Sequence, residues 1–146
     1  TTARAAVVAA DGRLLDVAKA ALEDRSPEGV LSTVERLMGQ LAAGRALEAV
    51  PLGVGFAGML RGPLVVNAPN FGWRDVDFGG ALSARLGRPV RLVNDLSAAA
   101  WGERSCGAAR GADDVFTVFV GTGVGSAIIA NGALVGGATQ VAGEFG

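Results

Sequence analysis

The chain has 146 residues and a mass of 14.6 kDa; half of its residues are hydrophobic, 18% are charged, and the formal net charge is −1. This is the length of one domain, or of pieces of two, and it can bury a core without disulfide bonds. The near-zero charge argues against a nucleic-acid-binding or polybasic membrane-surface protein. One cysteine, Cys106, and no histidine exclude a disulfide framework and a Ser–His or Cys–His hydrolase site, and they do not suit a protein-only zinc site.

The sequence favours a cytoplasmic location. Residues 1–10 lack the basic segment and long apolar block of a secretory signal. Residues 115–143 carry no charge and are long enough to span a bilayer. Glycines interrupt this stretch repeatedly, and Asn131-Gly132 within it is a strong hairpin signal, so a transmembrane helix is disfavoured. The single free cysteine agrees with a reducing compartment.

The first elements predicted are a hairpin and a helix. Residues 5–10 and 13–17 are apolar strands, and Asp11-Gly12 between them predicts a two-residue turn with positive φ at its centre. Ser26 then starts a helix, because serine caps free N–H groups and the proline and glutamate that follow suit the first turn. Apolar residues recur at helical spacing from there, and Gly44 is the expected stop.

Short strands and helices alternate through the middle of the chain. We expect strands at 49–56, 64–66 and 89–93, helices at 77–86 and 96–104, and a loop at 67–75. The segment from Gly53 to Gly58 matches G-x-G-x-x-G, but Pro63 opposes the helix that a dinucleotide site needs. It is interpreted as a strand packed closely against a neighbour, or as a strand end whose backbone at Gly58 approaches a ligand. A solvated face is predicted for Arg85, Arg88 and Arg91.

A polar break at residues 110–114 marks the predicted domain boundary. Beyond it we expect strands at 115–120, 126–130 and 133–135, with Asn131-Gly132 as the last turn. The alternation indicates an α/β protein whose helices cover a mixed sheet. The second half of the chain repeats the first with one more strand and a glycine-rich loop. We therefore expect a strand and a loop to precede Thr1, and the chain to be an internal segment of a longer protein.

The glycine loop (residues 121–125) is the best local signal for a ligand. Its glycines let backbone N–H groups approach a phosphate, and Thr122 and Ser126 add hydroxyl groups. The apolar residues that follow indicate a strand, and no Gly-Lys-Ser/Thr occurs, so neither a dinucleotide fingerprint nor a P-loop fits. A phosphate loop between two strands of a hairpin fits better, and a flexible hairpin without a ligand is the alternative.

Acidic residues supply the other candidates. Asn94-Asp95 ends a strand and begins a helix, where an aspartate can accept a proton from a substrate hydroxyl; an ordinary helix cap is the alternative. Glu144 follows the uncharged stretch and either binds polar ligand groups or is exposed. The remaining acidic pairs are interpreted as loop acids and helix caps, so no metal site is predicted: Asp75, Asp77, Asp113 and Asp114.

Taken in order, these segments resemble the ROK family of sugar kinases and sugar-responsive repressors. The matching segments cover nearly the whole chain: residues 67–73 (Asn-Ala-Pro-Asn-Phe-Gly-Trp), Asn94-Asp95 with its alanine-rich helix to Gly102-Glu103, residues 121–125, Asn131-Gly132, and residues 142–146 (Ala-Gly-Glu-Phe-Gly). The resemblance implies an actin-like (ribonuclease H-like) ATPase fold in which a mixed sheet is flanked by helices. It also implies two lobes, with residues 1–112 in the N-terminal lobe and 113–146 starting the C-terminal one.

The resemblance further implies a glucokinase-like kinase that transfers phosphate from ATP to a hexose hydroxyl. Asp95 would be the catalytic base; Gly58, Asn94 and Glu144 would join it in binding the sugar. The nucleotide phosphates would contact Gly121, Thr122 and Gly123, with Mg²⁺ neutralising their charge. The alternative is a sugar-sensing repressor of the same family, with a helix-turn-helix ahead of these residues.

Several family features lie outside these 146 residues. They include the first phosphate loop and a cysteine cluster that binds structural zinc in many members. The resemblance allows a homodimer, and no nucleic-acid or membrane contact is expected of this segment. Because half of the phosphate cradle is missing, we expect residues 1–146 alone to phosphorylate sugar poorly.

Overall fold

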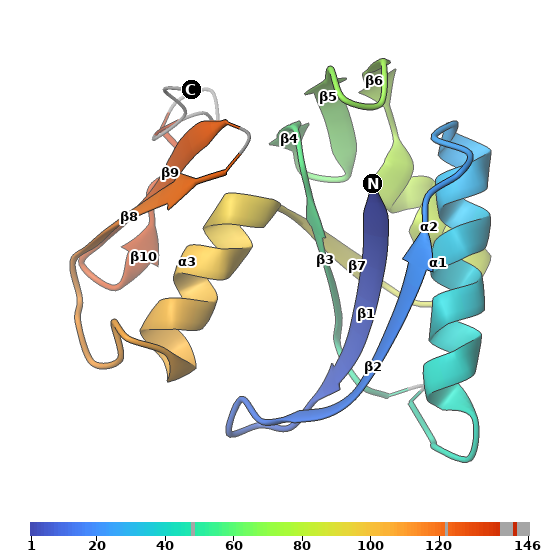
Figure 1. Ribbon diagram of the computed structural model, residues 1–146, viewed down its shortest axis with the longest axis horizontal. Coiled ribbons are helices and arrows are strands. Elements are labelled where there is room, and N and C mark those ends of the chain that lie inside the picture. Colours follow the sequence, from blue (N-terminus) through green and yellow to red (C-terminus); the bar gives the residue numbers. More distant parts are fainter. Residues whose placement is uncertain (48, 122, 138–141, 143–146) are drawn as a thin grey trace.

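The computed structural model describes residues 1–47, 49–121, 123–137 and 142, and within them three helices and ten strands (Figure 1). The strands form four small sheets, in the orders β1-β2, β3-β7, β4-β5-β6 and β10-β9-β8. In the described part of the chain no helix is both long and apolar enough to cross a membrane.

The first hairpin pairs β1 (Thr2–Val8) with β2 (Leu14–Ala21), but its turn differs from the prediction. Gly12 has a φ of +87°, whereas Asp11 has an ordinary negative φ. The Asp11 carboxylate instead accepts a hydrogen bond from the backbone N–H of Arg13 at 3.1 Å, which holds the aspartate in the turn without positive φ. The connection is therefore longer than two residues, and the strand register shifts between Val7 and Val8.

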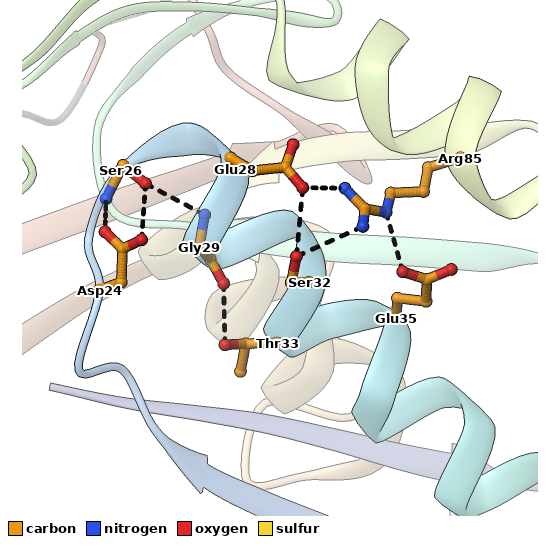
Figure 2. Close-up of polar contacts among 8 residues, drawn as sticks. All are labelled: Asp24, Ser26, Glu28, Gly29, Ser32, Thr33, Glu35 and Arg85. Atoms are coloured by element: carbon orange, nitrogen blue, oxygen red, sulfur yellow. Dashed lines mark hydrogen bonds and ion pairs between the residues drawn. The ribbon is translucent and has the colours of Figure 1, made fainter.

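Helix α1 (Pro27–Ala42) begins and ends as predicted. The Ser26 hydroxyl accepts a hydrogen bond from the Gly29 N–H at 3.1 Å and donates to the Asp24 carboxylate at 2.9 Å (Figure 2). Gly44, just past the helix, has a φ of +75°. The helix packs its buried leucines against the β1–β2 hairpin.

Helix α2 (Phe78–Leu86) is joined to α1 by a polar cluster around Arg85 (Figure 2). The Arg85 guanidinium pairs with Glu35 at 2.8 Å and also with Glu28, and it donates to the Ser32 hydroxyl. The hydrogen bond and charge of Arg85 lower the pKa of Glu28, and the hydrogen bonds to Glu28 and Glu35 raise the pKa of Arg85. Arg85 and Arg91 are exposed, as predicted, and Arg85 in addition pairs with two carboxylates of α1. Arg88 is half-buried and donates to the Leu47 carbonyl oxygen at 2.7 Å.

The next strands form one parallel pair and one antiparallel sheet. β3 (Leu52–Phe56) runs parallel to β7 (Val90–Asn94), while β4 (Met59–Arg61), β5 (Leu64–Ala68) and β6 (Trp73–Val76) form the sheet. Residues 67–75 were expected to be a loop, and that prediction is wrong at both ends. A tight turn closed by a hydrogen bond from the Gly72 N–H to the Pro69 carbonyl oxygen pairs Ala68 with Trp73 across the sheet.

Four aromatic rings form the centre of the core. The centroids of Phe56, Phe71, Trp73 and Phe78 lie 4.9–5.4 Å apart in their contacting pairs. The indole N–H of Trp73 donates to the Arg25 carbonyl oxygen at 2.8 Å, so its one polar atom is paired. Phe56 is the last residue of β3, and the core therefore supports the end of that strand.

The remaining elements form a second, smaller group. Helix α3 (Asp95–Cys106) packs on β9 (Val124–Ala130), which lies between β8 (Val115–Val120) and β10 (Ala133–Leu134). Asn131 and Gly132 both have positive φ, at 49° and 74°, as the predicted two-residue turn requires. The buried core of this second group consists of Ala100, Ala127 and Ile129.

The β1–β2 and β8–β9 hairpins, which the predicted internal repeat would relate to each other, differ in how their strands are paired. β9 has a pairing partner on each side, whereas β1 pairs only with β2 among the described residues. In Figure 1, β1 and β3 run in opposite directions. Residues of both strands, Ala6, Val7, Leu52 and Gly53 among them, line one cavity of about 220 Å³ without pairing across it.

Candidate functional site

The candidate site forms where β3 and β7 end. The two strands are parallel and Phe56 lies opposite Asn94, so both carboxyl ends meet at one edge of the sheet. Helix α3 starts at the next residue, Asp95. Ligands of open α/β sheets bind at this kind of edge, and a helix N-terminus there favours negative charge.

Asn94 connects the end of β7 to the start of α3 and to the turn after β3. Its side-chain oxygen accepts hydrogen bonds from the N–H groups of Leu96, at 2.9 Å, and Ser97, at 3.1 Å, and so caps α3. Its side-chain nitrogen donates to the Gly58 carbonyl oxygen at 3.3 Å. The helix-cap interpretation is therefore confirmed for Asn94, which also ties the cap to the turn after β3.

Asp95 presents a carboxylate at the surface. One of its oxygens accepts the Leu96 N–H at 3.0 Å, and no ion pair engages it among the described residues. Gly55 of β3 lies beneath it: a Cβ on that glycine would be 3.5 Å from the Asp95 Cα and 3.6 Å from the Ala98 Cβ. The close strand packing predicted for residues 53–58 is thus present. An exposed carboxylate in this position is chemically able to accept a proton.

Gly58 is held against β5. A Cβ at this position would lie 2.9 Å from the Asn67 carbonyl oxygen, closer than real Cβ atoms approach, and in a tight contact of 3.1 Å with the Ala68 Cβ. Glycine is therefore needed for space, and the backbone here is fixed by both Asn94 and the β5 strand.

The glycine loop joins β8 to β9, although β9 begins at Val124, inside the segment predicted as loop. Gly121 and Gly123 are exposed, and a Cβ on either would meet no described residue within 4 Å. Packing therefore does not require glycine at these two positions. The Gly121 N–H donates to the Gly123 carbonyl oxygen at 2.9 Å, so that amide is engaged within the turn. Thr122 and Glu144, also predicted to bind ligands, lie outside the described residues.

Leu96 links Asp95 to the glycine loop. The start of α3 and the β8–β9 connection lie at the same end of α3 (Figure 1). A Cβ on Gly125 would overlap the Leu96 Cδ1 atom, so the leucine lies directly on that part of β9. Leu96, the residue directly after Asp95, thus packs its side chain on Gly125. Nothing in the sequence pattern signals this contact, because the two residues are distant along the chain.

A cavity of about 970 Å³ opens beside this contact. Asn94 and Ser97 line it from the start of α3, Ser126 lines it from β9, and Leu60 lies on the β4 side. Asp95, Gly121 and Gly123 are not among its lining residues. The structure therefore brings Asn94 and Gly58 together, and Leu96, the residue after Asp95, packs on Gly125. It does not place Asp95, Gly121 and Gly123 on this cavity.

Comparison with known proteins finds glucokinases and a xylose repressor among the relatives of this chain. A glucokinase of Streptomyces coelicolor is 34% identical over 148 residues, which cover all of this chain and 46% of that protein. The crystal structure of a ROK family glucokinase from Streptomyces griseus, in complex with glucose and AMPPNP, superposes with a TM-score of 0.88 at 36% identity, covering all of this chain and 46% of that one. The xylose repressor of Bacillus subtilis is 35% identical over 82 residues, 56% of this chain and 21% of the repressor.

The chain spans about half the length of the curated relatives it matches. Its mixed α/β architecture is that of the ROK sugar kinases, which have the actin-like ATPase fold, as expected from the sequence. The ROK family pattern is matched over residues 1–146. This chain belongs to the ROK family.

Proposed function

We propose that the protein containing this chain transfers the γ-phosphate of ATP to a hexose hydroxyl, in a glucokinase-like reaction with Asp95 as general base. The observation that carries the proposal is the exposed Asp95 carboxylate at the carboxyl edge of β3 and β7, joined to the glycine loop through Leu96. The similarity to glucokinases over the whole chain, including one solved with glucose and AMPPNP, supports it.

In the proposed step the Asp95 carboxylate takes the proton of the sugar hydroxyl. The hydroxyl oxygen then forms a bond to the γ-phosphorus, and the bond from that phosphorus to the β–γ bridging oxygen breaks. ADP leaves with the electron pair of the broken bond. Phosphoryl transfer is mostly positioning and charge stabilisation, so the groups around Asp95 matter as much as the base.

The sugar would be held by backbone at Gly58 and by Asn94 and Glu144. The hydrogen bond from Asn94 to the Gly58 carbonyl oxygen supports this, because it fixes the backbone that we propose contacts the sugar. The nucleotide phosphates would lie at Gly121, Thr122 and Gly123. The roles of Glu144 and Thr122 rest on the family resemblance.

Mg²⁺ enters the proposal as a partner of the nucleotide. In the part of the chain that the structure describes, no three Asp, Glu, Cys or His residues gather to hold a metal ion. We propose an ion held chiefly by the substrate phosphates, which is how Mg²⁺ commonly binds in kinases. Such an ion would neutralise phosphate charge.

We also propose the lobe assignment, with residues 1–112 in the N-terminal lobe and 113–146 starting the C-terminal lobe. The split falls in the connection between α3 and β8. A cytoplasmic homodimer is part of the same proposal.

The repressor remains the alternative function, because a xylose repressor is among the relatives. The kinase is favoured since glucokinase similarity extends over the whole chain, while the repressor match covers 56% of it.

A sugar panel with the full-length protein tests the proposal. Hexoses and amino sugars are each assayed for formation of the sugar phosphate, with ATP and then polyphosphate as donor. We expect turnover with at least one hexose and ATP, and little or none from residues 1–146 alone. Sugar binding without turnover, together with sugar-dependent release of DNA, would instead establish the repressor.

A further inference from the structure

We infer that Leu96 and Gly125 form an interlock that sets the position of Asp95 relative to the glycine loop. Both are positioning residues: neither is proposed to touch a substrate. The inference rests on the proposed function, because the spacing it controls is that between the base and the phosphates of the nucleotide.

The contact is one of shape. Leu96 is in the first turn of α3, and Gly125 is near the start of β9, opposite Phe119 of β8. A Cβ on Gly125 would overlap the Leu96 Cδ1 and lie 3.8 Å from its Cγ. Gly125 does not have positive φ, so alanine could adopt its backbone conformation. A side chain at this position would therefore force the end of the Leu96 side chain to move.

The interlock is the site-proximal end of a row of close contacts. Ala100 lies one turn after Leu96 on the same face of α3 and is fully buried. Ala127 and Ile129 follow Gly125 on the same face of β9 and are also buried. Three of these residues, Ala100, Gly125 and Ala127, are small and let the helix lie close to the strand, and the Leu96–Gly125 contact fixes where the row begins.

The two partners each stand next to a proposed reacting group. Asp95 directly precedes Leu96, and Gly123 lies two residues before Gly125. A shift at the Leu96–Gly125 contact is therefore expected to move Asp95 relative to the glycine loop, because so few residues separate each contact partner from its reacting group. Misplacing a reacting group by about 1 Å can cost about 10²-fold in rate.

The test is a double-mutant cycle in the full-length protein, with kcat normalised to active enzyme. Gly125→Ala is expected to lower kcat by up to about 10-fold, since the added methyl pushes aside the end of the Leu96 side chain, which packs the start of α3 on β9. The sugar dissociation constant should change less than about 3-fold, because Asn94 is also held by its hydrogen bond to the Gly58 carbonyl oxygen. Adding Leu96→Ala to Gly125→Ala should restore kcat to that of Leu96→Ala alone, because the space is reopened.

Gly102→Ala is the matched control. It adds the same methyl on α3, where a Cβ would meet nothing within 4 Å, and should leave kcat unchanged. Thermal unfolding of each variant separates positioning from stability: the kinetic loss should persist well below the melting temperature.

Two results would overturn the inference. An active wild-type enzyme whose Gly125→Ala variant has normal kcat per active site would refute it while leaving the proposed function intact. Additive effects of the two substitutions on kcat would do the same. A wild-type protein without kinase activity on any sugar would remove the proposed function and this inference together.

Discussion

Replacing Asp95 by asparagine is expected to reduce kcat about 10²- to 10⁴-fold, the usual contribution of a positioned general base. Asparagine has the same shape and keeps an oxygen that can accept the Leu96 N–H, so the start of α3 should be preserved. Its amide does not accept the proton of a sugar hydroxyl. Steady-state ADP release gives kcat, and calorimetric titration with sugar should show binding that is largely retained.

Asp77→Asn is the control for the Asp95 substitution. Asp77 also precedes a helix, and its carboxylate caps α2 by accepting the Gly80 N–H at 2.9 Å. Asparagine caps equally well, so this variant should keep both its stability and its kcat. Equal kcat values for wild type and the Asp95 variant would show that the base is another group.

Phe78→Ala should lower the free energy of unfolding by about 3–5 kcal/mol, the cost of removing a buried phenylalanine ring. The ring is 1% exposed, and its centroid lies 5.2 Å from that of Trp73 and 5.4 Å from that of Phe56. Its loss leaves a cavity beneath the end of β3. Urea unfolding of the chain, followed by circular dichroism, measures the change.

Phe116→Ala is the matched control for this prediction, because Phe116 is 59% exposed on β8. It should cost less than about 1 kcal/mol. Equal losses for the two phenylalanines would mean that the aromatic cluster does not form the core described above.

Elements set by local chemistry could be predicted from the sequence. The Ser26 cap, the Gly44 stop and the Asn131-Gly132 turn depend on residues within a few positions of one another. The strand at 115–120 was predicted with the bounds that the structure has. Each signal is a property of a side chain or a backbone angle that neighbouring residues suffice to define.

Elements created by distant pairing could not be predicted in this way. β4 and β6 are three and four residues long and exist because each pairs with β5. Arg85 has two carboxylate partners only because α1 and α2 lie side by side. Neither the pattern around residue 73 nor that around residue 85 contains this information.

In the candidate site, too, the features set by neighbouring residues could be predicted and those set by distant residues could not. Asn94-Asp95 was predicted as a strand end and helix start, and the structure has it so. The bond from Asn94 to Gly58 and the packing of Leu96 on Gly125 join residues 36 and 29 positions apart, which no local pattern reports. The roles of Asp95, Gly58 and the glycine loop in catalysis stay predictions.

The central claim is that the carboxylate of Asp95 faces both a sugar hydroxyl and the terminal phosphate of the nucleotide. A crystal structure of the full-length protein with its preferred hexose and AMPPNP measures this directly. We predict a carboxylate oxygen of Asp95 within about 2.6–3.2 Å of the hydroxyl that points at the γ-phosphorus. A ternary complex with sugar and nucleotide bound in line and Asp95 in contact with neither would contradict the account.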